Sequence, residues 1–101
     1  MRDFIESLDP AGQRKFFFNM ELLQTFGRRL PEPHMKFLGD EIFELRFTGK
    51  EGAIRILYFF YDEDSVIFTN GFLKKTNKTP PREKALAMQR RIAYLAAKGK
   101  S

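Results

Sequence analysis

Residues 42–75 read IFELRFTGKEGAIRILYFFYDEDSVIFTNGFLKK, and this stretch decides the fold. It contains three apolar runs, at 42–48, 53–61 and 65–73. β-Branched and aromatic residues dominate the runs, which is typical of strands, and the short segments GKEG and DED between them are typical of turns. Because such short connections join antiparallel neighbours, we predict a three-stranded antiparallel meander with the run at 53–61 in its centre.

The first run alternates in character along its length. Phe43, Leu45 and Phe47 are predicted to point to one face of the sheet, and Glu44 and Arg46 to the other.

Arg55 interrupts the central apolar run, so it must reach an open face of the sheet or find a partner. We expect an ion pair with Glu44 on the neighbouring strand, and this pair leaves a functional role for Arg55 open.

Helical signals precede this stretch. Residues 2–8 predict a short amphipathic helix, and a second helix is predicted from Pro10 to Phe26 because Asp9 can cap it. Residues 27–41 hold two glycines and two prolines, so we expect a connecting segment there.

A last helix is predicted from Pro81 to Lys98, because Thr79-Pro80 repeats the signal of a cap followed by proline. The side of this helix that faces the core is expected to carry Ala85, Met88, Ile92 and Leu95. The fold class is therefore α+β, with two N-terminal helices packed on a small antiparallel sheet and a basic C-terminal helix. At 101 residues, we expect one domain, 1–101.

The positive charge is concentrated at one end of the chain. There are 18 Lys and Arg against 13 Asp and Glu, a net charge of +5. Residues 1–73 carry nine basic and twelve acidic side chains, a net of −3, whereas residues 74–101 carry nine basic and one acidic, a net of +8. Such a block favours a polyanionic partner, either nucleic acid or an acidic protein. A solvated helix surface is the alternative.

Composition excludes several kinds of chemistry. The chain has no Cys and one His, His34, so a disulfide scaffold, a thiolate nucleophile and a metal site built on Cys or several His are excluded. We expect neither a metal nor a cofactor. No apolar stretch is long enough to span a membrane and the N-terminus has no signal-peptide pattern, so we expect a cytoplasmic protein without membrane association.

Arg and Lys remain the main candidates for chemistry. RNA cleavage by an internal 2′-hydroxyl needs in-line positioning, a proton acceptor, stabilisation of charge at phosphorus and a proton donor. Arg suits phosphate contact, and Lys can transfer a proton if neighbouring cations depress its pKa. Lys74, Lys75 and Lys78 form such a group in the sequence, although simple RNA binding would use the same residues.

Four segments occur in an order that resembles a known family. They are LPEPHMKFL at 30–38, IFELR at 42–46, IRILYFF at 54–60 and GFLKKTNKTP at 71–80. Together they resemble the RelE/HigB superfamily of bacterial toxins, in its phage-derived branch. The pattern FxKKTxKTP followed by Glu83 is the most distinctive part, and the resemblance covers essentially the whole chain.

The resemblance implies the toxin of a type II toxin–antitoxin pair, a metal-independent endoribonuclease that cuts mRNA on the ribosome and so inhibits translation. The implied partners are mRNA, the ribosome and a cognate helix-turn-helix antitoxin, with which the toxin forms a hetero-oligomer. On the family pattern we assign catalytic roles to Arg55, Lys75 and Lys78, RNA contacts to Lys36, Arg46, Lys74, Thr79 and Arg82, and an orienting role to Glu44.

Two departures from the family pattern leave alternatives open. Family members usually begin with a β-strand, whereas this chain begins almost inside the first helix, so we expect the sheet to lack that strand. Some members use a Tyr or His near the C-terminus as acid or base, but Tyr94 lies far along the last helix and is expected to pack. The alternative functions are a catalytically inactive RNA-binding or regulatory protein with the same fold, and an interaction module for an acidic partner.

Overall fold

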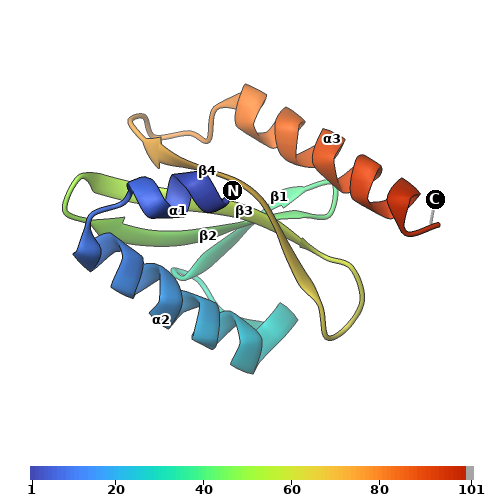
Figure 1. The fold of residues 1–101 in the computed structure, drawn as a ribbon, viewed down its shortest axis with the longest axis horizontal. Coiled ribbons are helices and arrows are strands. Elements are labelled where there is room, and N and C mark those ends of the chain that lie inside the picture. Colours follow the sequence, from blue (N-terminus) through green and yellow to red (C-terminus); the bar gives the residue numbers. More distant parts are fainter. Residues whose placement is uncertain (100–101) are drawn as a thin grey trace.

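A computed structural model describes residues 1–99 as helices on both sides of a four-stranded sheet (Figure 1). The helices are α1 (Arg2–Ser7), α2 (Pro10–Phe26), the short 3-10 helix η1 (Gly27–Arg29) and α3 (Pro81–Ala97). The strands are β1 (Met35–Gly39), β2 (Ile42–Gly49), β3 (Gly52–Phe60) and β4 (Val66–Lys74). All neighbouring strands are antiparallel, in the order β1-β2-β3-β4, which confirms the α+β class and the predicted meander.

Strand β1 corrects the interpretation of residues 27–41 as a connecting segment. Met35 pairs with Leu45 of β2, so this part of the chain forms an edge of the sheet. The turn after β1 consists of Asp40 and Glu41, both with positive φ, of 53° and 64°. Two consecutive residues with positive φ match the type I′ turn of a tight hairpin. The sequence did not predict this hairpin because Asp-Glu lacks the usual Asn-Gly signal.

The N-terminal helices cover one face of the sheet, as predicted. The core on this side consists of Leu8, Phe16, Leu23, Leu30, Leu45, Phe47, Ile54, Ile56 and Tyr58. Helix α2 has the predicted bounds, because the Asp9 carboxylate accepts a hydrogen bond from the Gly12 amide at its start and Gly27, with φ of 56°, ends it.

Helix α1 packs against β4 at Gly71. A Cβ atom added to Gly71 would overlap Cδ2 of Phe4, so the Phe4 ring occupies the space of the missing side chain. Glycine is required here for close approach, since a larger residue would push the helix away.

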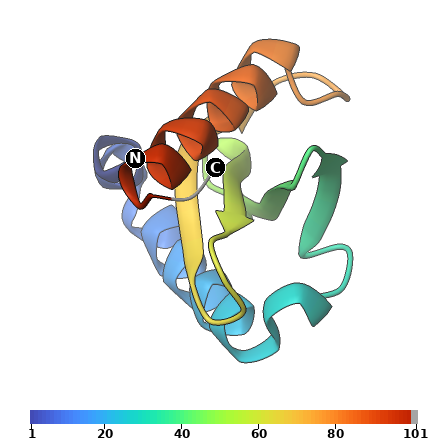
Figure 2. The ribbon, with the colours of Figure 1, turned by 90° about the vertical axis from the view of Figure 1, so that its right-hand side faces the viewer.

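Helix α3 covers part of the opposite face, and Figures 1 and 2 show it across the sheet from α2. Its contacts with the sheet form a second core with Ile42, Leu57, Phe59, Phe72 and Ala87. The expectation that Ile92 faces the core was wrong, because the buried side of α3 runs through Ala87 and Tyr94 and leaves Ile92 65% exposed. The Tyr94 ring packs on those of Phe59 and Tyr61, which is the packing role expected for it.

Within residues 1–99, the helices are too short or too polar to cross a membrane.

The contact between α1 and β4 can be tested by a double-mutant cycle. We expect Gly71→Ala to lower the free energy of unfolding by about 1–3 kcal/mol, because the new methyl group overlaps the Phe4 ring. In a Phe4→Ala background the same substitution should be less harmful, since the contact that remains is with the end of the Ile56 side chain, 2.9 Å from the added Cβ atom. Urea unfolding of the four proteins measures this, and equal losses in both backgrounds would contradict the contact.

Candidate nucleic-acid interface

The part of the second face that α3 leaves open carries charged side chains from all four strands. In the strand register Arg46 of β2 lies opposite Arg55 of β3, and Glu44 of β2 lies opposite Lys36 of β1. Directly opposed residues of antiparallel strands point to the same face, so these side chains share it. Lys74 ends β4, and its charge interacts with those of the other four. We call these five residues, Lys36, Glu44, Arg46, Arg55 and Lys74, the cationic cluster.

Glu44 is the centre of the cationic cluster and is fully buried. Its Oε1 atom lies 3.7 Å from Nε of Arg46 and 3.8 Å from Nε of Arg55, so the predicted pair with Arg55 is present and shared with a second arginine. The hydroxyl of Thr79 donates a hydrogen bond to the other carboxylate oxygen, Oε2. A buried carboxylate is tolerated only with such compensation. Glu44 thus joins β2, β3 and the loop before α3.

Arg55 is held in place by the backbone as well as by Glu44. It is 9% exposed, and its Nη1 atom donates hydrogen bonds to the carbonyl oxygens of Ile54, at 2.9 Å, and Phe47, at 3.4 Å. Burial lowers the pKa of the guanidinium, Arg46 lowers it further, and Glu44 opposes both. Arginine remains charged despite such shifts. Arg55 is therefore a fixed, largely desolvated cation.

Lys74 is a lysine of the cationic cluster whose pKa is lowered. Burial is the first cause of its lowered pKa, and the charge of Arg55 is the second. Glu44 raises this pKa, whereas Arg46 and Lys36 lower it. Because its side chain is only half-buried, Lys74 can reach a ligand on the open face. A lysine of this kind is better suited to proton transfer than an isolated surface lysine.

The remaining residues assigned from the sequence lie outside this cluster. Lys75, Lys78 and Arg82 are exposed, and within residues 1–99 their side chains make no ion pair. Lys75 lies one residue beyond the end of β4, and its charge is not among those that shift the pKa of Lys74. The structure thus brings Lys36, Arg46, Arg55 and Lys74 together around Glu44, but not Lys75.

Thr79 does not cap α3 as predicted. The N-cap position is Pro80, and the Thr79 hydroxyl instead donates to Glu44, 35 residues earlier in the chain. A buried carboxylate oxygen without a hydrogen-bond donor destabilises the fold, whereas water can hydrogen-bond the exposed first turn of α3.

Asn70, which sequence reasoning missed, fixes the start of α3. Its Nδ2 atom donates to the backbone carbonyl oxygen of Glu83, at 3.1 Å, and to the carboxylate of Glu83, at 3.0 Å. Thr69 is skipped in the pairing of β3 with β4, and this bulge leaves Asn70 opposite Leu57, on the face under α3. The only signal in the sequence was a pair of polar residues, Thr69 and Asn70, inside an apolar strand.

Much of the C-terminal positive charge holds α3 in place. Lys84 pairs with Asp40 at 2.9 Å, and Arg90 donates a hydrogen bond to the carbonyl oxygen of Thr69. Arg91 and Lys98 lie over the rings of Phe59 and Tyr94, at 5.9 and 5.5 Å from the ring centroids. Of the basic residues in 74–99, those with no such contact are Lys74, Lys75, Lys78 and Arg82, so these are the C-terminal cations that remain for a ligand.

Metal-binding side chains and a tyrosine are other groups that could supply chemistry at this face. Within residues 1–99, no group of three or more His, Cys, Asp or Glu side chains is placed to hold a metal ion. Burial raises the pKa of Tyr58, whose side chain belongs to the core on the opposite face of the sheet, so its phenol stays protonated away from the cluster.

Comparison with known families agrees with one part of the resemblance. The family described as phage derived protein Gp49-like (DUF891) matches residues 3–92, which include all four strands and the whole cationic cluster. The chain therefore belongs to the Gp49-like family of phage-derived proteins. Comparison with curated proteins gives no match.

Removing the charge of Glu44 tests its central position. We expect Glu44→Gln to lower the free energy of unfolding by about 3 kcal/mol, because two desolvated guanidiniums lose their counter-charge. Glutamine keeps the size of the side chain and an oxygen for Thr79, so the loss isolates the charge. Urea unfolding measures it, with Glu51→Gln at the exposed β2–β3 turn as a control. Equal stability of Glu44→Gln and the wild type would refute the compensation described here.

Proposed function

We propose that this protein is the toxin of a type II toxin–antitoxin system, a RelE/HigB-like endoribonuclease that cuts mRNA on the ribosome and so inhibits translation. The observation that carries the proposal is the cationic cluster, in which Arg46, Arg55 and Lys74 share one open sheet face around a buried carboxylate. Membership of a phage-derived family and the resemblance of residues 71–80 to these toxins support it.

In the proposed mechanism the RNA backbone crosses the open part of the second face. Arg46 and Arg55 contact the scissile phosphate, and Lys36 contacts a neighbouring one. Because Arg55 is already oriented by Glu44 and two carbonyl oxygens, it stabilises the charge that develops at phosphorus without rearranging. The exposed Lys75, Lys78 and Arg82, with the half-buried Thr79, extend the contact along the loop before α3 and its first turn.

The chemical step needs no group beyond the RNA and this chain. The 2′-hydroxyl loses its proton and attacks phosphorus in line, the bond to the 5′-oxygen breaks, and that oxygen takes up a proton, which leaves a 2′,3′-cyclic phosphate. Lys74 is the candidate for proton transfer that the geometry favours, because partial burial and then the neighbouring cations lower its pKa. Lys75 and Lys78 are the candidates that the family resemblance favours.

The proposal implies partners in the cytoplasm. They are mRNA, the ribosome and a helix-turn-helix antitoxin that forms a hetero-oligomer with the toxin. A short neighbouring reading frame for such an antitoxin would support the proposal.

A catalytically inactive RNA-binding protein with the same fold is the second candidate. It is favoured by Tyr94, the tyrosine of the last helix considered as acid or base, whose ring packs on those of Phe59 and Tyr61. An assay on translating ribosomes that yields no cut product at any codon would decide for it. RNA binding with little dependence on salt would instead favour an interaction module for an acidic protein.

Expression in growing cells tests the assignment of the site. We expect Arg55→Met to relieve growth arrest and to lower mRNA cleavage by roughly 100-fold or more, because the developing charge loses its fixed donor. Lys74→Met should reduce cleavage more than Lys75→Met if the geometry is the better guide. Arg14→Met, on the exposed side of α2, serves as the matched control and should stay toxic. Full toxicity of a folded Arg55→Met protein would show that the site is wrong.

The lowered pKa of Lys74 predicts a pH dependence of RNA binding. As pH rises through that pKa the ammonium loses its charge, so affinity for RNA should fall at a lower pH than for an ordinary lysine. Lys74→Arg keeps its charge and should remove this part of the fall. Anisotropy of a labelled RNA between about pH 7 and 10, at constant ionic strength, measures both proteins. Identical curves would exclude Lys74 as the titrating group.

A further inference from the structure

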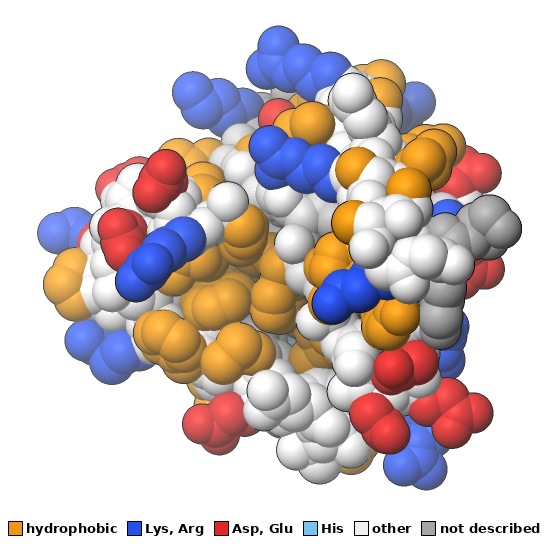
Figure 3. Space-filling view, turned by 45° about the vertical axis from the view of Figure 1, so that its right-hand side comes forward, with side chains coloured by type: hydrophobic (Ala, Val, Ile, Leu, Met, Phe, Trp, Pro, Cys, Tyr) orange, Lys and Arg blue, Asp and Glu red, His pale blue; other side chains and the backbone are white. Residues whose placement is uncertain are grey.

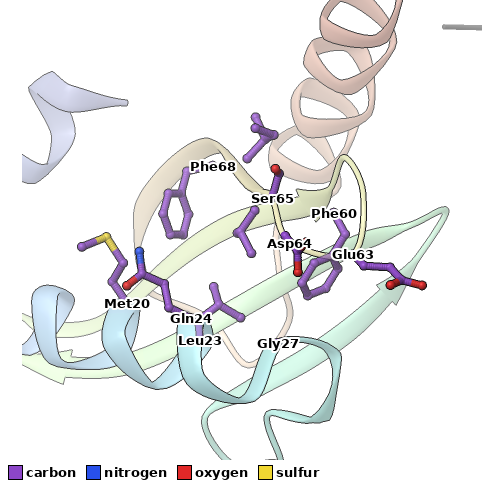
Figure 4. Close-up of a pocket in the computed structure, with 11 residues that line it drawn as sticks. Met20, Leu23, Gln24, Gly27, Phe60, Glu63, Asp64, Ser65 and Phe68 are labelled. Atoms are coloured by element: carbon purple, nitrogen blue, oxygen red, sulfur yellow. The ribbon is translucent and has the colours of Figure 1, made fainter.

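A groove lies between α2 and the β3–β4 hairpin, away from the cationic cluster. Its volume is about 590 Å³, and Figure 4 shows side chains from α2 and from the hairpin turned toward it. Its apolar lining consists of Met20, Leu23, Phe60, Val66, Ile67 and Phe68. Most of these residues belong to the core under α2, so the groove opens on the face opposite the cluster and at the other end of β4.

Exposed aromatic surface extends this groove along α2. Phe17 is 50% exposed and precedes Met20 by three residues, so the two side chains lie on the same side of the helix. Phe16 bridges them to the hairpin, with its ring 5.4 Å from that of Phe17 and 5.6 Å from that of Phe68. Figure 3 shows hydrophobic side chains gathered in a hollow on the side where α2 and the hairpin lie next to each other. Contiguous exposed apolar surface of this kind is typical of an interaction site.

The charge at the groove is opposite to that of the chain. Its charged lining residues are Glu63 and Asp64, at the tip of the hairpin, in a chain with a net charge of +5. Arg28 adds one positive charge at this wall, with its guanidinium 4.4 Å from the centroid of the Phe60 ring, and the two carboxylates outnumber it. The rim therefore favours a ligand with positive charge beside its apolar part.

We propose that the groove binds an amphipathic helix of a partner protein. Apolar side chains of that helix enter the groove between Met20 and Phe68, and Lys or Arg side chains beside them pair with Glu63 and Asp64. Helix α2 forms one wall of the groove, and a second helix can pack on it by interlocking side chains. Binding of an amphipathic helix in an apolar groove is a common mode of recognition.

A second copy of this chain fits the groove less well. Within residues 1–99, the basic helix α3 offers a single large exposed hydrophobic residue, Ile92. A different protein is therefore the occupant to which the structure points.

The position of the groove separates this inference from the proposed function. RNA at the cationic cluster and a helix in the groove would touch opposite faces of the sheet, so neither blocks the other directly. The inference does not rest on RNA cleavage, and its test uses no activity of the protein.

The chain contains no Trp, so the Trp emission of an added peptide can be measured without a contribution from the protein. The probe is a synthetic helix of about 16 residues with Leu and one Trp on one face and Lys on the other. We expect its Trp emission to shift to shorter wavelength, with saturation, when the protein is added. A matched peptide with Glu in place of Lys should bind roughly tenfold more weakly, because it repels Glu63 and Asp64. The inference is overturned if the Lys peptide shows no saturable shift.

Variants locate the binding to the groove. Met20→Glu should weaken the peptide by about tenfold or more, since it puts a charge on the apolar floor. The exposed pair Glu63→Lys and Asp64→Lys should weaken it by about threefold without affecting the core, and Glu51→Lys is the matched control. Thermal unfolding shows that each variant is folded. Undiminished binding by the variants would overturn the inference, and so would self-association of the wild type that Met20→Glu abolishes, because a second copy would then be the occupant.

Discussion

A single buried carboxylate organises the open face of the sheet. Glu44 has no exposed surface, and it is neutralised by Arg46 on its own strand and Arg55 on the next, with a hydrogen bond from Thr79. Arg55 is buried beside this carboxylate, and the carboxylate is compensated by Arg55 and by the partly exposed Arg46. The same interaction therefore holds two guanidiniums at one surface and ties the loop before α3 to the sheet.

The second constraint is the incomplete cover of that face. Asn70 fixes the start of α3 through Glu83, and the buried side of the helix meets the sheet around Ala87. The rest of the face stays open for the cations, which stand on strands and are therefore positioned more rigidly than loop residues. On the opposite side α2 covers the sheet but leaves a groove at the hairpin. The molecule thus presents two different surfaces, a cationic one proposed to bind RNA and an apolar groove proposed to bind a basic amphipathic helix.

The fold was predictable wherever local signals agreed. Helix α2 begins and ends where Asp9 and Gly27 indicate, and each predicted strand lies within one residue of the observed one at either end. Strand β1 was missed because it is short and its turn, Asp40-Glu41, carries no familiar signal. The predicted buried side of α3 included Ile92, which is exposed, whereas the observed one includes Ala87 and Tyr94. Apolar residues lie on several sides of this helix, and the contact with the sheet decides which of them are buried.

By itself the sequence determined the antiparallel meander, the helices around it and the pairing of Arg55 with Glu44, and it left Arg and Lys as the main candidates for chemistry. These follow from periodicity, turn residues and composition, all of which act over a few neighbouring positions. The tertiary structure alone decided that Lys74 rather than Lys75 joins Arg55, that Thr79 serves Glu44, and that a groove opens beside α2. These depend on contacts between residues far apart in the chain, such as the 35-residue separation of Glu44 and Thr79, and no local pattern records them.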